Sequence, residues 1–152
     1  MDRHFTVSIY IVHKNKALLH LHKKAKKILP FGGHIELNEL PEEACIREEQ
    51  EESGLKINLY NPFNQQLKNS CELAGEKLLI NPMYTIWGEI NPEHYHIDFV
   101  YYATANSFDT LPGNGESNLL KWYSNEDLKN AYDIPHNILT MAYEALELLG
   151  ER

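Results

Sequence analysis

The feature that most constrains this 152-residue chain is an acidic segment, residues 32–55, which opens with Gly32-Gly33 and ends with Gly54-Leu55. The segment holds eight glutamates and one arginine, a balance of −7, whereas the whole chain carries −8. The acidity is therefore local, and the rest of the chain is nearly neutral. A chain without a basic stripe is a poor match to duplex nucleic acid, but carboxylates that bind cations can still hold a polyphosphate.

Residues 41–53 are predicted to form a helix. Pro41 is tolerated in a first helical turn, and Gly54 is a typical C-terminal stop. Leu40 is a poor N-cap residue, so Asn38 is the candidate that caps this helix.

Three glutamates of this helix, Glu48, Glu51 and Glu52, share one face when each residue turns by about 100°. Spacing alone favours a solvated acidic face, on which like charges repel. The Gly-Gly pair changes that balance, because backbone without side chains approaches closely and can offer a carbonyl oxygen to a cation. Mg²⁺ takes such oxygen ligands and keeps several waters. The sequence therefore predicts a divalent-cation site.

The fixed positions of this segment resemble the signature box of the Nudix hydrolases, and they are Gly33, Glu39, Arg47-Glu48, Glu51-Glu52 and Gly54-Leu55. The resemblance implies a pyrophosphohydrolase that uses Mg²⁺ or Mn²⁺ to cleave a nucleoside diphosphate linked to another moiety. It also implies roles: metal ligation by Glu48, Glu51, Glu52 and the carbonyl of Gly32, support of the metal site by Glu39, and orientation of a carboxylate by Arg47. A bidentate arginine is suited to that last role.

One position departs from the box, because Glu49 stands where a bulky apolar residue is expected. On the helix it lies between Cys45 and Ile46, in the arc that should face the core. A buried, unpaired carboxylate is costly, so Glu49 must be exposed, paired or protonated. Of these readings we favour a helix edge that reaches water over a fourth metal ligand.

The general base and the substrate contacts lie outside the helix. Glu116, in the glycine-rich loop "GNGESNLLKWYS", is the first candidate for the base, and a solvated loop acid is the alternative. Lys27, in a lysine-rich turn, is a candidate for phosphate contact, and Phe31 for stacking on a base, although solvated turns and core aromatics are more common. His94 and His96 point to one strand face, where two imidazoles are too few for zinc; packing or substrate contact remain open.

The chain reads as one α+β domain over residues 1–152, with a mixed β-sheet flanked by helices. The resemblance implies the Nudix α/β/α sandwich. Further helices are expected at 125–130 and 134–149, and strands at 6–13, 17–22, 55–60, within 78–90, 95–105 and 119–124, with a polar connection at 61–77.

We expect a cytoplasmic protein that acts on a small nucleoside-diphosphate-type molecule, as a monomer or homodimer and without membrane contact. Its apolar runs are shorter than the roughly 18 residues of a membrane span, and Cys45 and Cys71 form no disulfide or metal motif. Two other classes remain: a Nudix-fold sensor that binds a nucleotide without cleaving it, and an acidic interaction helix. The intact glutamate triad and Arg47 favour the enzyme over the sensor, and the glycines favour it over the interaction helix.

Overall fold

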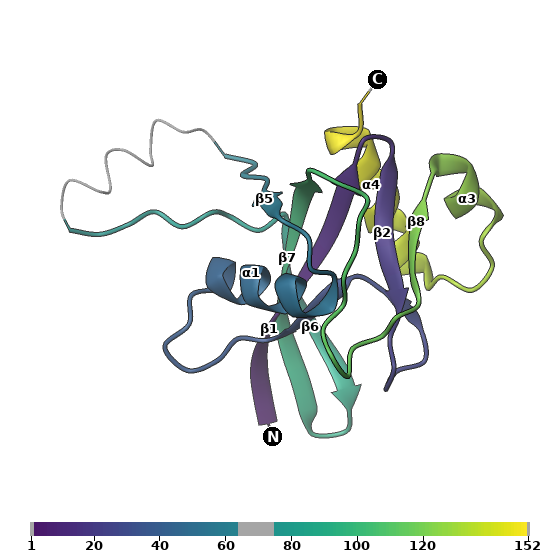
Figure 1. The fold of residues 1–152 in the computed structure, drawn as a ribbon. Helices are drawn as coiled ribbons and strands as arrows, with labels where there is room; N and C mark the ends of the chain where they lie inside the picture. The colour runs from purple at the N-terminus through teal and green to yellow at the C-terminus, as the bar shows by residue number, and fades with distance from the viewer. Residues whose placement is uncertain (1, 64–74, 152) are drawn as a thin grey trace.

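An eight-stranded mixed β-sheet carries helices on its faces in the computed structural model, which describes residues 2–63 and 75–151 (Figure 1). The helices are α1 (Pro41–Glu52), α3 (Asn125–Asn130) and α4 (His136–Leu149). The strands are β1 (Asp2–His13), β2 (Lys16–Leu21), β3 (Ile28–Leu29), β4 (Phe31–His34), β5 (Ile57–Leu59), β6 (Tyr84–Asn91), β7 (His94–Ala105) and β8 (Leu120–Tyr123). This arrangement confirms the predicted α+β class. Part of the predicted connection at 61–77, Cys71 included, lies outside the described residues.

Strand β1 is the centre of the sheet. It pairs in parallel with β7 and antiparallel with both β2 and β4, and the main strand order is β3-β2-β1-β7-β5. The pairing of β4 sets Gly32 opposite Ser8 and Gly33 opposite Val7. Gly32 and Gly33 therefore lie within strand β4, beside the middle of the central strand of the sheet.

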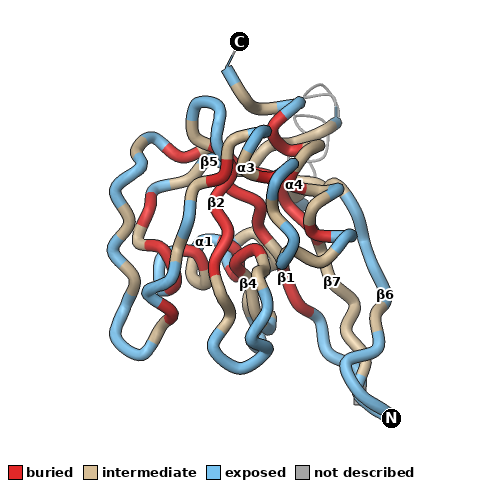
Figure 2. The backbone as a smooth tube through the Cα atoms, turned by 90° about the vertical axis from the view of Figure 1, so that its right-hand side faces the viewer, coloured by how far each residue is buried: buried red, intermediate tan, exposed pale blue. Residues whose placement is uncertain are grey.

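The two faces of the sheet form two apolar clusters, because side chains alternate along each strand. One cluster joins Val7, Ile9 and Ile11 of β1 to Ala44 and Cys45 of α1. The other joins Tyr10 and Val12 of β1 to the apolar side of α4, which supplies Ile138, Ala142, Ala145 and Leu146. The helices α1 and α4 thus cover opposite faces, with buried stretches between them in β1 and β2 (Figure 2). Among the described helices, none has the length and apolar character that a membrane span requires.

The ends of α1 differ in part from the prediction. Asn38 has a φ of 69° and caps nothing; Leu40 is the N-cap, and its N–H donates to the Glu43 carboxylate at 2.9 Å. Gly54 ends the helix as expected, with a φ of 74°. A Cβ at Gly54 would lie 2.5 Å from the carbonyl oxygen of Leu111, so only glycine fits this close approach.

Candidate metal centre

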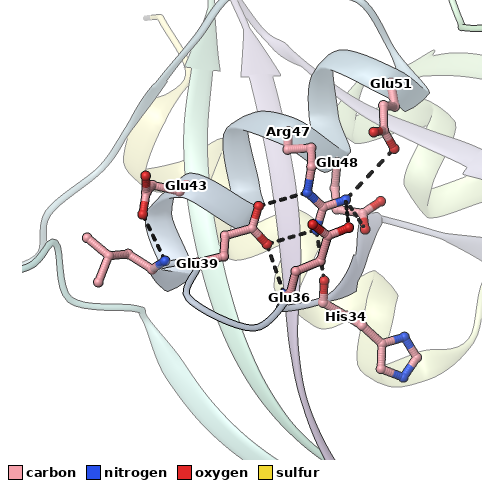
Figure 3. Close-up of polar contacts among 8 residues, drawn as sticks. His34, Glu36, Glu39, Glu43, Arg47, Glu48 and Glu51 are labelled. Carbon is pink, nitrogen blue, oxygen red and sulfur yellow. Dashed lines mark hydrogen bonds and ion pairs between the residues drawn. The ribbon is translucent and has the colours of Figure 1, made fainter.

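Arg47 is the hub of the polar contacts on α1 (Figure 3). Its guanidinium donates to both carboxylate oxygens of Glu39, at 2.8 and 2.9 Å, and to Glu48 Oε1 at 2.9 Å. It also donates to the carbonyl oxygen of His34 at 2.9 Å. The hydrogen bonds from Arg47 lower the pKa of Glu39. The guanidinium thereby ties the helix to the preceding turn and fixes the direction of the Glu48 carboxylate.

The Glu48 carboxylate lies against Gly33 of β4. A Cβ at Gly33 would lie 2.3 Å from Glu48 Oε1, so the carboxylate occupies the space that a side chain would fill. Burial is the largest cause that raises the pKa of Glu48, the Arg47 hydrogen bond opposes it, and the charges of Glu51 and Glu116 add to it. The carboxylate is therefore held close to backbone, where burial and two neighbouring acids oppose its negative charge and Arg47 supports it.

Glu52 is the most deeply placed acid of the predicted triad, with 6% of its surface exposed. Its Oε1 accepts a hydrogen bond from the N–H of Gly32 at 2.9 Å. The pKa of Glu52 is raised to about 8, chiefly by burial and further by the charges of Glu48 and Glu116, against the lowering effect of the Gly32 hydrogen bond. Glu51, by contrast, is exposed, and its Oε2 lies 3.9 Å from Arg47 Nη1.

His20 was not among the predicted site residues, yet it faces Glu52 from β2. Its side chain is 3% exposed, and its Nε2 lies 3.6 Å from Glu52 Oε2 without a hydrogen-bond partner. Burial, followed by the nearby His22, lowers the pKa of His20 to about 4, so the ring is neutral at pH 7. Strand alternation carries the signal for this placement, because His20 falls on the same face as the buried Leu18.

The glycine-rich loop packs against the end of α1 and brings Glu116 to the same cluster. The N–H of Gly113 donates to the carbonyl of Glu51 at 2.8 Å, and Lys23 Nζ donates to the carbonyl of Gly115 at 2.7 Å. The half-buried Glu116 raises the pKa of both Glu48 and Glu52 through its charge. The structure thus places the candidate base beside the candidate metal ligands.

Two sequence expectations need correction. Phe31 is fully buried, at 0% exposure, where it packs in the core and against the His20 ring, so it has no free face on which a base could stack. Glu49 does not reach water: it is 1% exposed and accepts a hydrogen bond from the Ser53 hydroxyl. The Ser53 hydrogen bond supports the paired reading, and burial raises the pKa of Glu49. Lys27 is exposed on the turn after β2, as a phosphate contact requires.

The two histidines of β7 lie on the sheet face away from α1, as does Asp98 of the same strand. Asp98 accepts hydrogen bonds from Thr6 and Ser8, each at 2.7 Å, and is thereby engaged in the sheet. His96 lies against His34 and His4, with ring centroids 5.2 and 6.2 Å apart, and His94 lies on the same face. The sequence showed only the two histidines of β7, because the other two come from distant strands.

The side chains present fit a hard divalent cation. Carboxylates and a backbone carbonyl are the ligands that Mg²⁺ and Mn²⁺ prefer. Within residues 2–63 and 75–151, no three His, Cys, Asp or Glu side chains already surround a single point. However, burial raises the pKa of both Glu48 and Glu52, and Glu52 faces an unpartnered ring nitrogen, so a bound cation would stabilise the deprotonated carboxylates.

Comparison with known proteins assigns the family. The family model "NUDIX domain" matches residues 2–142. A crystal structure of a hydrolase of the NUDIX family from Clostridium perfringens is 68% identical, with a TM-score of 0.91 over 98% of this chain and 99% of that one. The chain therefore belongs to the NUDIX family.

More distant relatives share the fold. A Caenorhabditis elegans Ap4A hydrolase has a TM-score of 0.66 at 18% identity, over 95% of this chain and 98% of that one. The NUDIX domain of Shewanella oneidensis NrtR, solved with ADP ribose, has a TM-score of 0.68 at 14% identity, over 98% and 90%. Among curated proteins, no match to the chain was found.

Proposed function

We propose that this protein hydrolyses the diphosphate linkage of a nucleoside diphosphate joined to another moiety, with Mg²⁺ or Mn²⁺ as cofactor. The observation that carries the proposal is the approach of Glu48 and Glu52 to Gly32 and Gly33 of β4, where Arg47 holds the Glu48 carboxylate and burial raises the pKa of both acids. The charge of Glu116 adds to both of these pKa shifts. The structural neighbours include an Ap4A hydrolase and a UDP-X diphosphatase, which supports a nucleotide-type substrate.

The metal ion would be held by Glu48, Glu51, Glu52 and the carbonyl of Gly32. When bound, it would supply Lewis-acid polarisation of the phosphoryl group and neutralise charge on the diphosphate. Arg47 acts through Glu39 and Glu48, since its hydrogen bonds hold both of these carboxylates in place. Arg47 and Glu39 are therefore positioning residues in this proposal.

Glu116 is the proposed general base. It takes a proton from the water whose oxygen forms a new bond to phosphorus, and the bond from phosphorus to the bridging oxygen breaks on the opposite side. Lys27 lies on the exposed turn between β2 and β3 and would contact the outer phosphate of the substrate. We propose a cytoplasmic setting for this reaction, since the described Cys45 is a free and buried thiol.

Hydrolysis across a panel of compounds tests the proposal. The panel holds nucleoside triphosphates, nucleotide sugars, dinucleoside polyphosphates, ADP-ribose and NADH, each with Mg²⁺ or Mn²⁺. We expect turnover of at least one compound, its loss in Glu52→Gln, and its retention in Glu147→Gln, which removes an exposed charge from the remote α4. Turnover that survives in Glu52→Gln would refute the assigned metal site.

A sensor that binds a nucleotide without cleaving it is the second candidate. It is favoured by one observation, the solved complex of the NrtR NUDIX domain with ADP ribose. The same panel separates the two functions, because a sensor would bind one compound tightly and cleave none of them.

A further inference from the structure

The buried ring of His20 has one nitrogen that nothing in the fold uses. Its Nε2 is the single buried side-chain nitrogen or oxygen without a hydrogen-bond partner among residues 2–63 and 75–151. The ring also bonds the backbone of Pro30, whose only polar group is its carbonyl oxygen, so the ring donates that bond. Because Nε2 has no partner, the donor is Nδ1, and the neutral ring presents its lone pair at Nε2.

That lone pair is aimed at another acceptor. Nε2 lies 3.6 Å from Glu52 Oε2, which is too long for a hydrogen bond. The other oxygen of Glu52 is already occupied by the Gly32 N–H. Once Glu52 is deprotonated, its Oε2 and His20 Nε2 are two buried acceptors that face each other, which is unfavourable unless a proton or a cation lies between them.

The separation of the two atoms fits a shared metal ion. Two ligands about 2.1 Å from a tetrahedral ion lie roughly 3.4 Å apart, and at a right angle they lie roughly 3.0 Å apart. The observed 3.6 Å is therefore within a few tenths of an ångström of a ligand pair. The Phe31 ring, 4.5 Å from the imidazole between centroids, and the strand position of His20 hold the nitrogen in this direction.

We propose that His20 Nε2 is a nitrogen ligand to the divalent cation bound by Glu52, which gives this chain a mixed nitrogen–oxygen metal site. Imidazole binds Mn²⁺ and Co²⁺ more readily than it binds Mg²⁺, so His20 shifts the preference of the site toward transition ions. The inference rests on the proposed metal role of Glu52. It adds a ligand from β2, outside the acidic segment.

The first test is pulsed electron paramagnetic resonance of the protein loaded with Mn²⁺ alone. Wild-type protein should show coupling of the bound Mn²⁺ to an imidazole nitrogen. The coupling should vanish in His20→Leu and persist in His136→Gln, which removes an exposed imidazole at the start of α4. Absence of the coupling in wild type, or its persistence in His20→Leu, would overturn the proposal.

The second test compares two ions by calorimetric titration. His20→Leu should weaken Co²⁺ binding by about tenfold or more and Mg²⁺ binding much less. A histidine that only fills the core would leave the ratio of the two affinities unchanged, which would count against a ligand role. The metal-free His20→Leu protein should melt close to wild type, because leucine removes the unpartnered Nε2 and fits the apolar surroundings but loses the bond to the Pro30 carbonyl. If it does not fold, His20→Gln replaces it in both titrations.

These results are separable from the proposed function. Hydrolysis that depends on Glu52 without nitrogen coupling would overturn the His20 ligand and leave the enzyme proposal standing. Nitrogen coupling that is lost in His20→Leu, together with no turnover of any compound, would support the ligand and refute the enzyme proposal.

Discussion

At the scale of single residues, the adjacent Gly32 and Gly33 of β4 are each required for a different reason. A Cβ at Gly32 would lie 2.0 Å from the carbonyl oxygen of Val7, which is backbone in the central strand and cannot move away. A Cβ at Gly33 would meet the end of the Glu48 side chain, which can rotate. Gly32 is therefore required for the backbone packing of β4 on β1, and Gly33 is required for the position of Glu48, a candidate metal ligand.

Two alanine substitutions should separate these purposes. Gly32→Ala should lower the free energy of unfolding by about 3 kcal/mol or more, since strand backbone must shift. Gly33→Ala should cost about 1 kcal/mol or less, but it should reduce the gain in free energy of unfolding that Mg²⁺ produces, because Glu48 is displaced. Urea unfolding with and without Mg²⁺ measures both effects. Equal destabilisation by the two variants would contradict this division.

The buried Glu52 makes the metal-free protein sensitive to alkaline pH. Its folded-state pKa is raised from 4.5 to about 8, so its stabilising contribution is complete below pH 4.5 and is lost as the pH rises through 8. Between pH 7 and 8 the free energy of unfolding should fall by up to about 1.4 kcal/mol per pH unit. The lowered pKa values of His20 and His96 act only below about pH 6.5, outside this window.

Urea unfolding in EDTA at pH 6, 7 and 8 checks this expectation. Glu52→Gln should show a clearly smaller loss of stability over this range, because it has no proton to release. The slope need not vanish, since the pKa of Glu48 is raised as well. Parallel pH dependences of wild type and variant would show that Glu52 is not the group responsible.

At the scale of elements, α1 presents two faces with opposite demands. Its core face holds Ala44, Cys45 and, against expectation, Glu49, whose carboxylate pairs with Ser53 at the end of the same helix. The Ser53 hydroxyl also accepts the N–H of Leu55 at 3.2 Å. The carboxylate of Glu49, which stands at a normally apolar position of the box, is therefore hydrogen-bonded within one helix turn, on the side away from the metal ligands.

Glu49→Gln should keep hydrolysis close to wild type and should be at least as stable at pH 8. The amide keeps an acceptor for Ser53 and removes a charge that burial disfavours. Ser53→Ala should instead lower the free energy of unfolding by about 1–3 kcal/mol, because it removes the hydroxyl that donates to the buried Glu49 and accepts from the Leu55 N–H. Turnover and thermal unfolding of the two variants decide the matter. A folded Glu49→Gln without activity would make Glu49 part of the site.

Local sequence signals located most of these elements, as α1, β2 and β7 show. The helix was bounded correctly by Pro41 and Gly54, because a fixed φ and a positive φ are properties of single residues. The prediction failed where a partner in space decides. Asn38 is no cap, because the Glu43 side chain takes the Leu40 N–H instead. Glu49 is buried, because Ser53 satisfies it.

At the scale of the whole molecule, the candidate site is assembled from α1, β2, β4 and the glycine-rich loop. The acidic segment identified the family and most proposed ligands, but it could not identify His20, which lies on β2. The parallel pairing of β1 with β7, which joins Asp2 to His94 and Val12 to Thr104, has no signature in local sequence. The same pairing gathers His4 and His96, and it explains why the histidine cluster could not be foreseen.

Binding at this one site should stabilise the opposite face of the molecule. Helices α1 and α4 both pack on β1 but from different sides, so they share one sheet and should unfold together. A cation at 100 times its dissociation constant adds about 2.7 kcal/mol to the free energy of unfolding. Core amides of α4, such as that of Leu146, should then exchange roughly 100-fold more slowly with Mg²⁺ than without it.

Hydrogen exchange measured residue by residue tests this coupling, with Glu52→Gln as the control that should show little Mg²⁺ effect in either helix. Slower amide exchange in α1 and β4 alone would mean that α4 opens independently of the metal site. In that case the cation would order only the acidic segment. Equal slowing in both helices would mean that the whole domain unfolds as one unit. The carboxylates of α1 would then lower the free energy of unfolding of the entire metal-free domain.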